Sequence, residues 1–356
     1  MTDPRWKKLA DVLAQYSVGV KPGEKVLITM MEIDTFPLAR ACYQAVVEAG
    51  GLPTIEFQSV YLERDLMKLG NQEQVAWVNE MQIRGMDWAD CYIGLRGARN
   101  PSEFSDIPVD VLASHKASMG TVSARRNNTR WVLTRVPNEA FAQQAGIPLD
   151  EMMEFYFNAC LQDWEKAVAV MERVRERFQR GTRVRIVGKD TDLTFSTDGR
   201  LYCIGMGHAN MPDGEVFTSP LEDTVNGYVY FDYPAIYGGR KIEGVRLRFD
   251  EGKLVEASSD TEQELLRAVL SSDAGASKLG EFGIGMNDAI THYSSDILYD
   301  EKIGGTIHLA MGRGYAKCKG TNSSSLHWDI VKRMRSGGKI YVDGELVMEN
   351  GRLLEG

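Results

Sequence analysis

A change of hydrophobic period near residue 180 is the feature that most constrains how this chain folds. Up to Arg180, short apolar runs alternate with stretches whose apolar residues recur every three or four positions. After Gly181, segments such as 182–188 and 192–197 alternate apolar and polar residues. The first pattern is typical of strands alternating with helices, and the second of an antiparallel sheet built from hairpins. The sequence therefore predicts an α/β part followed by a largely β, α+β part.

The first part, residues 1–180, predicts an open, mostly parallel sheet covered by helices. No glycine-rich phosphate loop follows its first apolar run, so a nucleotide site lacks its usual backbone cradle. We interpret this part as a scaffold or specificity domain with a long connecting helix. The expected strands are KVLITM (25–30), LPTIEFQ (52–58), DCYIGLRG (90–97) and WVLTRV (131–136), and the expected helices are 5–18, 36–50, most of 61–85 and 148–180.

The second part, residues 181–356, predicts an antiparallel sheet and carries the informative polar residues. Turn dipeptides such as Asp198-Gly199 separate its alternating segments, as expected of hairpins. One further helix is expected over 260–271, and a pair of hairpins over 339–354. A chain of 356 residues suggests about two domains, so we place one boundary near residue 180.

Composition limits the partners and the compartment. The net charge of −9 and the pI near 5.3 argue against a nucleic-acid partner, which usually requires a basic surface. No apolar stretch reaches the roughly 18 residues of a membrane-spanning helix, and MTDPRWKKLADVL lacks a signal-peptide run. The five cysteines are far apart and form no CxxC pair, so we expect reduced thiols. We therefore expect a soluble, cytoplasmic protein without membrane partners.

Four glycine-rich segments of the second part carry isolated carboxylates and histidines. Glu215 follows a Pro-Asp-Gly turn, where a solvated carboxylate is the plainer interpretation. Glu281 enters the apolar run FGIGM, where a lone carboxylate is costly to bury. His308 lies in the run TIHLAM, where a hydrogen-bonded core imidazole is common. His327 and Asp329 share one face of an extended segment, because strand side chains alternate with period two.

Together these segments supply three carboxylates and two imidazoles, without a cysteine. Such donors fit hard or borderline divalent ions such as Zn, Co, Mn or Mg. Five ligands with water suit a two-metal hydrolytic site. The set therefore predicts metal chemistry, although each residue alone is a weak signal.

The order Glu…Glu…His…Tyr…His-x-Asp, in the contexts PDGEVFTSP, LGEFGIGMN, IHLAMGRGY and HWD, resembles the thermophilic metallo-aminopeptidase family, that of aminopeptidases T and S. The resemblance covers roughly residues 205–330. It implies that Glu281 bridges two divalent metal ions and that Tyr315 is a catalytic or ligating phenol. The metal ligands that it implies are Glu215, Glu281, His308, His327 and Asp329.

The resemblance implies an aminopeptidase that releases N-terminal residues from peptides through a water activated by two metals. Tyr315 would donate a hydrogen bond to the tetrahedral oxyanion, and Glu281 or Glu215 would take up the proton. The implied partner is a peptide substrate, and the implied assembly is a homodimer.

A ring-cleaving dioxygenase that acts on dihydroxypyridines resembles the same fold family and is the main alternative. It would hold one Fe(II) with His308, His327 and Asp329, a two-histidine, one-carboxylate set. Glu215 and Glu281 favour the peptidase, because a single-iron oxygenase does not need them. A non-catalytic module that keeps a relic of the site is a third alternative, which the intact ligand set argues against.

Overall fold

The computed structural model describes residues 3–354, which divide into two compact units. Unit 1 comprises Met1–Leu161 and Gly207–Pro212, and unit 2 comprises Gln162–Met206 and Asp213–Gly356. Within the described range, no helix has the length and the apolar composition that crossing a membrane requires.

The division falls at Leu161 rather than near residue 180. Helix α9 (Trp164–Gln179) counts with unit 2 because its buried Val174 and Phe178 belong to the core of that unit. The single long helix expected over 148–180 is two helices. The side chain of Asp163 accepts a hydrogen bond from the backbone N–H of Lys166 at 3.2 Å, which caps α9 and ends the preceding helix pattern.

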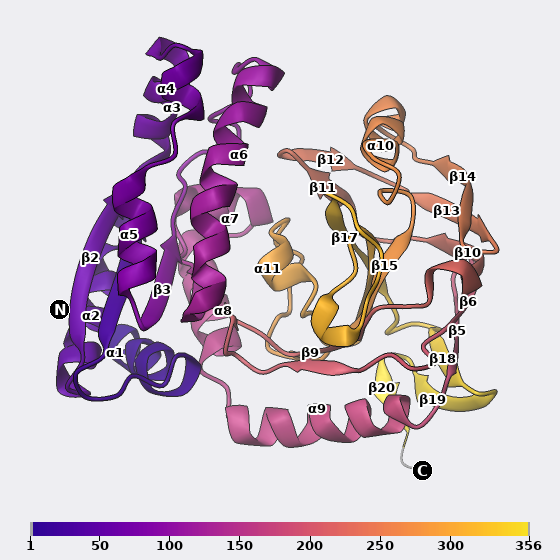
Figure 1. Cartoon of the computed structure of the whole chain (residues 1–356). Coiled ribbons are helices and arrows are strands. Elements are labelled where there is room, and N and C mark those ends of the chain that lie inside the picture. Colours follow the sequence, from indigo (N-terminus) through magenta and orange to yellow (C-terminus); the bar gives the residue numbers. More distant parts are fainter. Residues whose placement is uncertain (1–2, 355–356) are drawn as a thin grey trace. The chain divides into compact units, whose positions relative to one another are not determined.

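Unit 1 contains the expected open parallel sheet, of which Figure 1 labels β2 and β3. Its strand order is β2-β1-β3-β4-β8. The central strands β1 and β3 are buried along most of their length, as parallel strands covered on both faces usually are. The sequence patterns do not predict α6 or the short β8. Strand β8 lies in the segment Gly207–Pro212, which belongs to unit 1 although it is distant from the rest of that unit in sequence. The elements are α1 (Arg5–Asp11) with a wider turn over Val12–Ser17, β1 (Lys25–Met31), α2 (Phe36–Glu48), β2 (Leu52–Gln58), α3 (Val60–Leu69), α4 (Gln72–Ala76), α5 (Glu80–Trp88), β3 (Cys91–Arg96), α6 (Val109–Arg125), β4 (Arg130–Arg135), α7 (Glu139–Ala145), α8 (Leu149–Cys160) and β8 (Asn210–Met211).

Unit 2 contains two antiparallel sheets, as expected for the second part of the chain. The larger has the order β14-β13-β10-β6-β5-β18-β19-β20, and the smaller has the order β17-β16-β15-β9-β7. Their strands are β5 (Arg183–Gly188), β6 (Thr191–Ser196), β7 (Cys203–Gly205), β9 (Glu215–Thr218), β10 (Asn226–Tyr230), β13 (Arg246–Asp250), β14 (Lys253–Ser258), β15 (Leu279–Gly285), β16 (Thr306–Gly312), β17 (His327–Arg333), β18 (Lys339–Val342), β19 (Glu345–Glu349) and β20 (Arg352–Leu353). A hairpin of β11 (Ala235–Tyr237) and β12 (Arg240–Ile242) and the helices α10 (Gln263–Leu270) and α11 (Ile297–Asp300) complete the unit.

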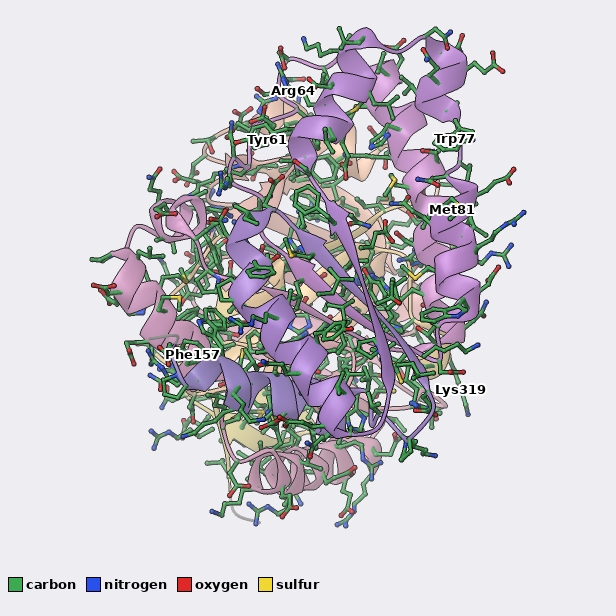
Figure 2. All side chains as sticks on the ribbon, turned by 90° about the vertical axis from the view of Figure 1, so that its left-hand side faces the viewer. Tyr61, Arg64, Trp77, Met81, Phe157 and Lys319 are labelled. Atoms are coloured by element: carbon green, nitrogen blue, oxygen red, sulfur yellow. The ribbon has the colours of Figure 1, made fainter. Side chains whose placement is uncertain are left out.

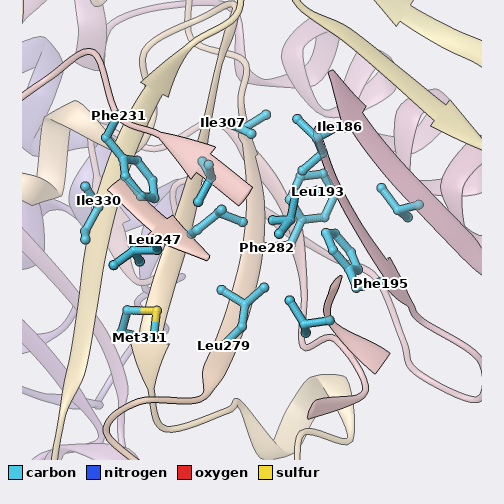
Figure 3. Close-up of a cluster of buried hydrophobic side chains, with 14 of the residues drawn as sticks. Ile186, Leu193, Phe195, Phe231, Leu247, Leu279, Phe282, Ile307, Met311 and Ile330 are labelled. Carbon is cyan, nitrogen blue, oxygen red and sulfur yellow. The ribbon is translucent and has the colours of Figure 1, made fainter. Parts of the chain in front are cut away.

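The hydrophobic core of unit 2 contains side chains from both sheets (Figure 3). Phe282 of β15 and Phe195 of β6, for example, have ring centroids 5.2 Å apart. Apolar residues at every second position of the smaller sheet face this core, and the residues between them face the other way. The smaller sheet therefore has one face free to carry polar chemistry, and the expected α/β and α+β fold class is confirmed.

Candidate metal centre

Four neighbouring strands of the smaller sheet bring the predicted ligands onto its second face. Glu281 pairs with Ala310, and Ala310 pairs with Asp329, so two carboxylates flank a small residue. His308 lies two positions before Ala310 on β16, and His327 lies two positions before Asp329 on β17. Glu215 begins β9 beside β15. All five predicted ligands thus come together within unit 2.

Small residues make room for the ligands on this face. A Cβ atom added at Gly283 would lie 2.0 Å from Nε2 of His308, so only glycine leaves space for the imidazole there. A Cβ atom at Gly205 would lie 2.3 Å from Oδ1 of Asp213 and 2.9 Å from Cγ of Glu215. The glycine-rich texture of these segments is therefore a packing requirement of the carboxylates and imidazoles.

The two oxygens of Glu281 face two different histidines. Its Oε1 lies 3.5 Å from Nε2 of His308, and its Oε2 lies 3.3 Å from Nε2 of His327. Nε2 of His308 also lies 3.2 Å from Oε2 of Glu215, and Nε2 of His327 lies 3.4 Å from Oδ2 of Asp329. Glu281 therefore belongs to two ligand groups, one with Glu215 and His308 and the other with His327 and Asp329.

Backbone carbonyls fix the orientation of both imidazoles. Nδ1 of His308 lies 3.0 Å from the carbonyl oxygen of Glu301, and Nδ1 of His327 lies 2.9 Å from that of Arg313. A carbonyl accepts only, so each Nδ1 carries the proton and leaves the lone pair of a neutral ring on Nε2. Such an outer hydrogen bond is the usual support of a metal-binding histidine.

Buried ligand atoms that lack a hydrogen-bond partner indicate whether these residues fit a metal ion. Across residues 3–354, the buried side-chain atoms without a hydrogen-bond partner include four atoms of this cluster. They are Oε2 of Glu215, Oε2 of Glu281, Nε2 of His308 and Oδ1 of Asp329. Buried polar atoms are costly when unsatisfied, and divalent cations are natural partners for carboxylate oxygens and imidazole nitrogens. The donor set fits metal ions.

Glu301 and Lys302 belong to the cluster, although sequence reasoning missed them. The Glu301 carboxylate forms a third possible ligand group with His308 and Asp329. The buried ammonium of Lys302 lies 2.8 Å from Oε1 of Glu215 and contacts Glu301. It holds Glu215 so that the other carboxylate oxygen points to His308. The only signal in the sequence is the charged trio Asp-Glu-Lys before Ile-Gly-Gly, a pattern that usually marks a solvated turn.

The close packing of charges shifts the acid–base behaviour of the cluster. Burial would raise the pKa of Glu215, but the Lys302 ammonium and the His308 imidazole together outweigh it and hold the pKa down to about 2. Burial would lower the pKa of His327, but the carboxylates of Asp329 and Glu281 together outweigh it and raise the pKa to about 9. Burial raises the pKa of Glu301 to about 8. In the metal-free protein at neutral pH, His327 and Glu301 therefore tend to hold their protons, whereas Glu215 is ionised.

Tyr315 lies beside the cluster, where the sequence places it. Its ring centroid is 4.8 Å from that of His327 and 5.7 Å from that of Phe217. Its backbone N–H donates to Oγ of Ser219 at 3.0 Å, which anchors the turn that follows β16. Burial raises the pKa of the phenol above its usual range, and the negative charge of Glu281 adds to this effect. Tyr315 therefore stays protonated and able to donate a hydrogen bond.

A cavity of about 220 Å³ lies beside two of the predicted ligands. His327, Asp329 and Asp300 are its lining residues with an imidazole or a carboxyl group. The remaining wall is largely apolar and aromatic. It is formed by Pro234, Ile236, Tyr237, Gly238, Tyr293, Ile297, Trp328 and Val331.

The other histidines lie outside these ligand groups. His208 is part of unit 1, where its ring packs 5.1 Å from that of Tyr16. His115, also in unit 1, is buried with Nε2 3.6 Å from a carboxylate oxygen of Glu63.

Comparisons with known proteins indicate the family to which the chain is similar. The profile of the thermophilic metalloprotease family (M29) matches residues 2–353. Aminopeptidase T of Thermus thermophilus is 25% identical over 401 aligned residues, which cover 97% of this chain and 97% of the relative. The solved structure of wild-type AmpT from Thermus thermophilus has a TM-score of 0.88 at 22% identity and covers 99% of both chains. A 2,5-dihydroxypyridine dioxygenase from Pseudomonas putida KT2440 shares the fold, with a TM-score of 0.61 at 15% identity over 98% of this chain and 96% of that one.

These similarities confirm the resemblance drawn from the ligand segments. The profile covers nearly the whole chain, including the N-terminal part, for which the sequence motifs gave the weakest indication. The likeness to the dioxygenase is one of fold, at low sequence identity. The expected enzyme class, a metallo-aminopeptidase, agrees with the family and with the relative. The chain therefore belongs to the thermophilic metalloprotease family (M29), the family of metallo-aminopeptidases that its ligand segments resemble.

Proposed function

We propose that this enzyme releases N-terminal residues from peptides at a centre of two divalent metal ions bridged by Glu281. One ion would be held by Glu215 and His308, and the other by His327 and Asp329. This proposal rests mainly on one observation: the two oxygens of Glu281 face the Nε2 atoms of two different histidines, at 3.5 and 3.3 Å. A single-ion site has no use for a carboxylate divided in this way, whereas two-metal hydrolases commonly use a bridging one.

The charge of the cluster supports two ions rather than one. When all its carboxylates are ionised and both imidazoles are neutral, five negative charges face one ammonium, which leaves a net charge of −4. Two divalent cations neutralise this charge, and one leaves half of it buried at a high cost. The groups counted are Asp213, Glu215, Glu281, Glu301, Asp329 and Lys302.

Metal ions held there would supply Lewis-acid activation of a water and of the scissile carbonyl. The chain itself supplies the other functions. Tyr315 donates the hydrogen bond of its neutral phenol to the oxygen on which negative charge develops. Glu301, outside the bridged pair but within the cluster, accepts the proton of the attacking water. Lys302 holds Glu215 and Glu301 in place.

The cavity beside His327 and Asp329 supports a place for the first side chain of the peptide. Its volume of about 220 Å³ is below the roughly 300–1,000 Å³ of sites that enclose a whole small molecule. It therefore suits one amino-acid side chain. Because Ile236, Ile297 and Trp328 line it, we propose that the enzyme prefers peptides that begin with an apolar residue.

The arrangement of ligand atoms argues against the single-iron dioxygenase. A two-histidine, one-carboxylate iron site requires His308, His327 and Asp329 around one ion. Among the described residues, the ligand groups within 4.8 Å pair Asp329 with either histidine, but none contains both. The likeness to the dioxygenase therefore supports a common scaffold with a different centre.

Metal content and hydrolysis test the proposal together. Protein stripped with a chelator and reconstituted with zinc, cobalt, manganese or magnesium should bind two ions per chain and cleave aminoacyl arylamides. The same substrates with a blocked N-terminus should be inert. Glu281→Gln should lose both bound metal and activity, whereas Glu264→Gln, at an exposed position of α10, should keep both. One bound iron per chain with oxygen consumption would overturn the proposal.

We also propose a homodimer in a reducing compartment such as the cytoplasm. Unit 1 exposes apolar side chains, among them Leu62 and Trp77, which line one groove, and Met81, which is 76% exposed. Figure 2 shows Trp77 and Met81 on the same side of the unit. Contiguous apolar patches of this kind commonly mark protein interfaces. A Trp77→Glu, Met81→Glu double variant should sediment as a monomer; a variant that stays dimeric would exclude this surface as the interface. The five free cysteines support the compartment.

A further inference from the structure

Two cysteines of unit 2 lie next to each other at the edge of the proposed active site. Cys203 is on β7, and Cys318 ends the short turn Ala316–Cys318 that follows Tyr315. Their sulfur atoms are 3.4 Å apart, although the residues are 115 positions apart in sequence. A backbone hydrogen bond of 3.2 Å from Leu201 N–H to the carbonyl of Cys318 holds the two segments together.

We propose that Cys203 and Cys318 are a redox modification site, which forms a reversible disulfide by exchange with low-molecular-weight disulfides and thereby lowers the peptidase activity. The loss of activity rests on the proposed function, whereas formation of the disulfide does not.

The geometry allows the bond to form with a small movement. A disulfide requires sulfur atoms about 2.05 Å apart, so these two must approach by about 1.4 Å. The movement falls on the turn, because β7 is tied into the sheet by its pairing with β9. The turn carries Lys317 and Lys319, both exposed, on either side of Cys318.

The two thiols have unequal roles in the exchange. Cys203 is partly exposed and can meet a small disulfide, whereas Cys318 is buried behind it. The Cys318 thiol donates a hydrogen bond to the sulfur of Cys203, which lowers the pKa of Cys203 to about 7, and the Lys317 ammonium adds to this effect. A low pKa and access to solvent are the properties of an attacking cysteine.

The exchange balances in two displacements. The thiolate of Cys203 attacks one sulfur of a disulfide R–S–S–R and releases one thiolate RS⁻, which leaves a mixed disulfide on Cys203. Cys318 then loses its proton to water, and its sulfur attacks that of Cys203 and releases the second RS⁻. The two cysteines are oxidised, and one R–S–S–R is reduced to two thiols. A dithiol reagent returns both cysteines to thiols and is itself oxidised to a cyclic disulfide.

The disulfide would affect activity by displacing Tyr315, which lies three residues before Cys318. Tyr315 is held by its N–H bond to Ser219 and by ring packing on His327 at 4.8 Å. The backbone N–H of Cys318 donates to the carbonyl of Tyr315 at 3.0 Å, so a shift of one is passed to the other. Displacement of a catalytic group by about 1 Å costs on the order of a hundredfold in rate.

The other cysteines provide the contrast. Cys42, Cys91 and Cys160 are fully buried in unit 1, and burial raises the pKa of each of these thiols. Buried thiols of this kind act as small apolar side chains and resist oxidation. The pair in unit 2 is therefore the expected point of reaction.

Treatment of the metal-loaded enzyme with oxidised glutathione tests the proposal. We expect the chain to lose the mass of two hydrogen atoms, to keep three of its five thiols, and to yield a peptide linking Cys203 to Cys318. Activity should fall by about tenfold or more and return with dithiothreitol, while the metal content stays constant. Five intact thiols, or glutathione that remains attached to Cys203, would overturn the modification site.

Variants separate the disulfide from general damage. Cys203→Ser should keep the activity of the reduced enzyme and lose its sensitivity to oxidised glutathione, and Cys318→Ala should take up one glutathione on Cys203. Cys42→Ala, a matched control outside the pair, should respond as the wild type does. A wild-type enzyme that forms the disulfide with unchanged activity would refute the regulatory role. An enzyme that forms it but never cleaves arylamides would instead refute the proposed function.

Discussion

Replacing Gly283 by alanine tests the position of His308 without substituting any of the predicted metal ligands. A Cβ atom at this position would lie 2.0 Å from Nε2 and 2.1 Å from Cε1 of the imidazole. Heavy atoms in contact prefer separations of about 3.5–4.0 Å, so the ring must retreat by about 1.4 Å or more. It cannot simply swing into solvent, because His308 is fully buried and its Nδ1 is held by the carbonyl of Glu301 at 3.0 Å.

The expected cost divides between stability and function. Adding one methyl group to a packed interior typically costs about 1–3 kcal/mol, so Gly283→Ala should unfold at a lower temperature and still fold. A histidine moved from its place should weaken metal binding by about 10–100-fold, the range found when the support of a ligand is lost. The specificity constant kcat/KM should fall by roughly a hundredfold, because reacting groups tolerate about 1 Å of error poorly.

Gly188→Ala is the matched control. Gly188 ends β5 in the same unit, and a Cβ atom there would first meet Cε of Lys332 at 3.4 Å, an ordinary contact. Thermal unfolding, zinc titration and arylamide hydrolysis should all be close to wild type for this variant. Wild-type metal affinity in Gly283→Ala would refute the reasoning, because it would mean that His308 either lies elsewhere or does not bind metal.

Three further changes test separate parts of the site. Glu301→Gln should lower kcat by about 10²–10⁴-fold and leave two metals bound, because it removes the proposed proton acceptor; loss of a metal instead would make Glu301 a ligand. Zinc affinity should rise with pH up to about 9: charged neighbours raise the pKa of both His308 and His327 against the effect of burial, so metal must displace their protons. Calorimetry in buffers of different ionisation enthalpy should detect proton release when zinc binds at pH 7. If no protons are released, the assignment of these two histidines as ligands is contradicted. Ile297→Ala enlarges the proposed side-chain cavity and should raise kcat/KM for phenylalanyl over alanyl arylamides by about tenfold; an unchanged ratio would place the first side chain elsewhere.

The sequence predicts the strands and the assembly of the ligands because both depend on local pattern. The apolar runs expected at 25–30 and 52–58 are β1 and β2, and the alternating segment at 192–197 is β6 shifted by one residue. The candidate ligands are carboxylates and imidazoles that interrupt otherwise apolar strands, and the resemblance to the metallo-aminopeptidase family, rather than the pattern alone, implies that they bind metal. Their roles as ligands stay a prediction, which the geometry supports and metal analysis must test.

Features that arise from tertiary contacts were not visible in the sequence. Glu301 follows a helix of only four residues, and nothing near it marks a buried position. Lys302 is fully buried, which a charged turn does not suggest, because its ammonium is matched by carboxylates from distant segments. The break between α8 and α9 depends on Asp163 as a cap, within a stretch whose apolar spacing continues on both sides.

The segment LGEFGIG shows why the core and the site of unit 2 are specified together. Leu279 and Glu281 are two positions apart, so a regular strand would place both on one face. The pairing of β15 with β16 shifts between them: Leu279 pairs with Met311, and Glu281 pairs with Ala310. This bulge at Gly280 sends Leu279 to the core and Glu281 to the ligands, as bulges beside active sites often redirect a side chain.

Glycine is required at the bulge, since a Cβ atom at position 280 would lie 2.2 Å from the carbonyl oxygen of Gly312. Beyond it, Phe282 faces the core and Gly283 faces His308, in step with the partner strand. A slip of this pairing by one residue would bury Glu281 in the apolar core and expose Phe282 to the ligands. The desolvation cost of the carboxylate and the lost packing of the ring oppose that slip, so the same contacts that stabilise unit 2 also set the register of the metal centre.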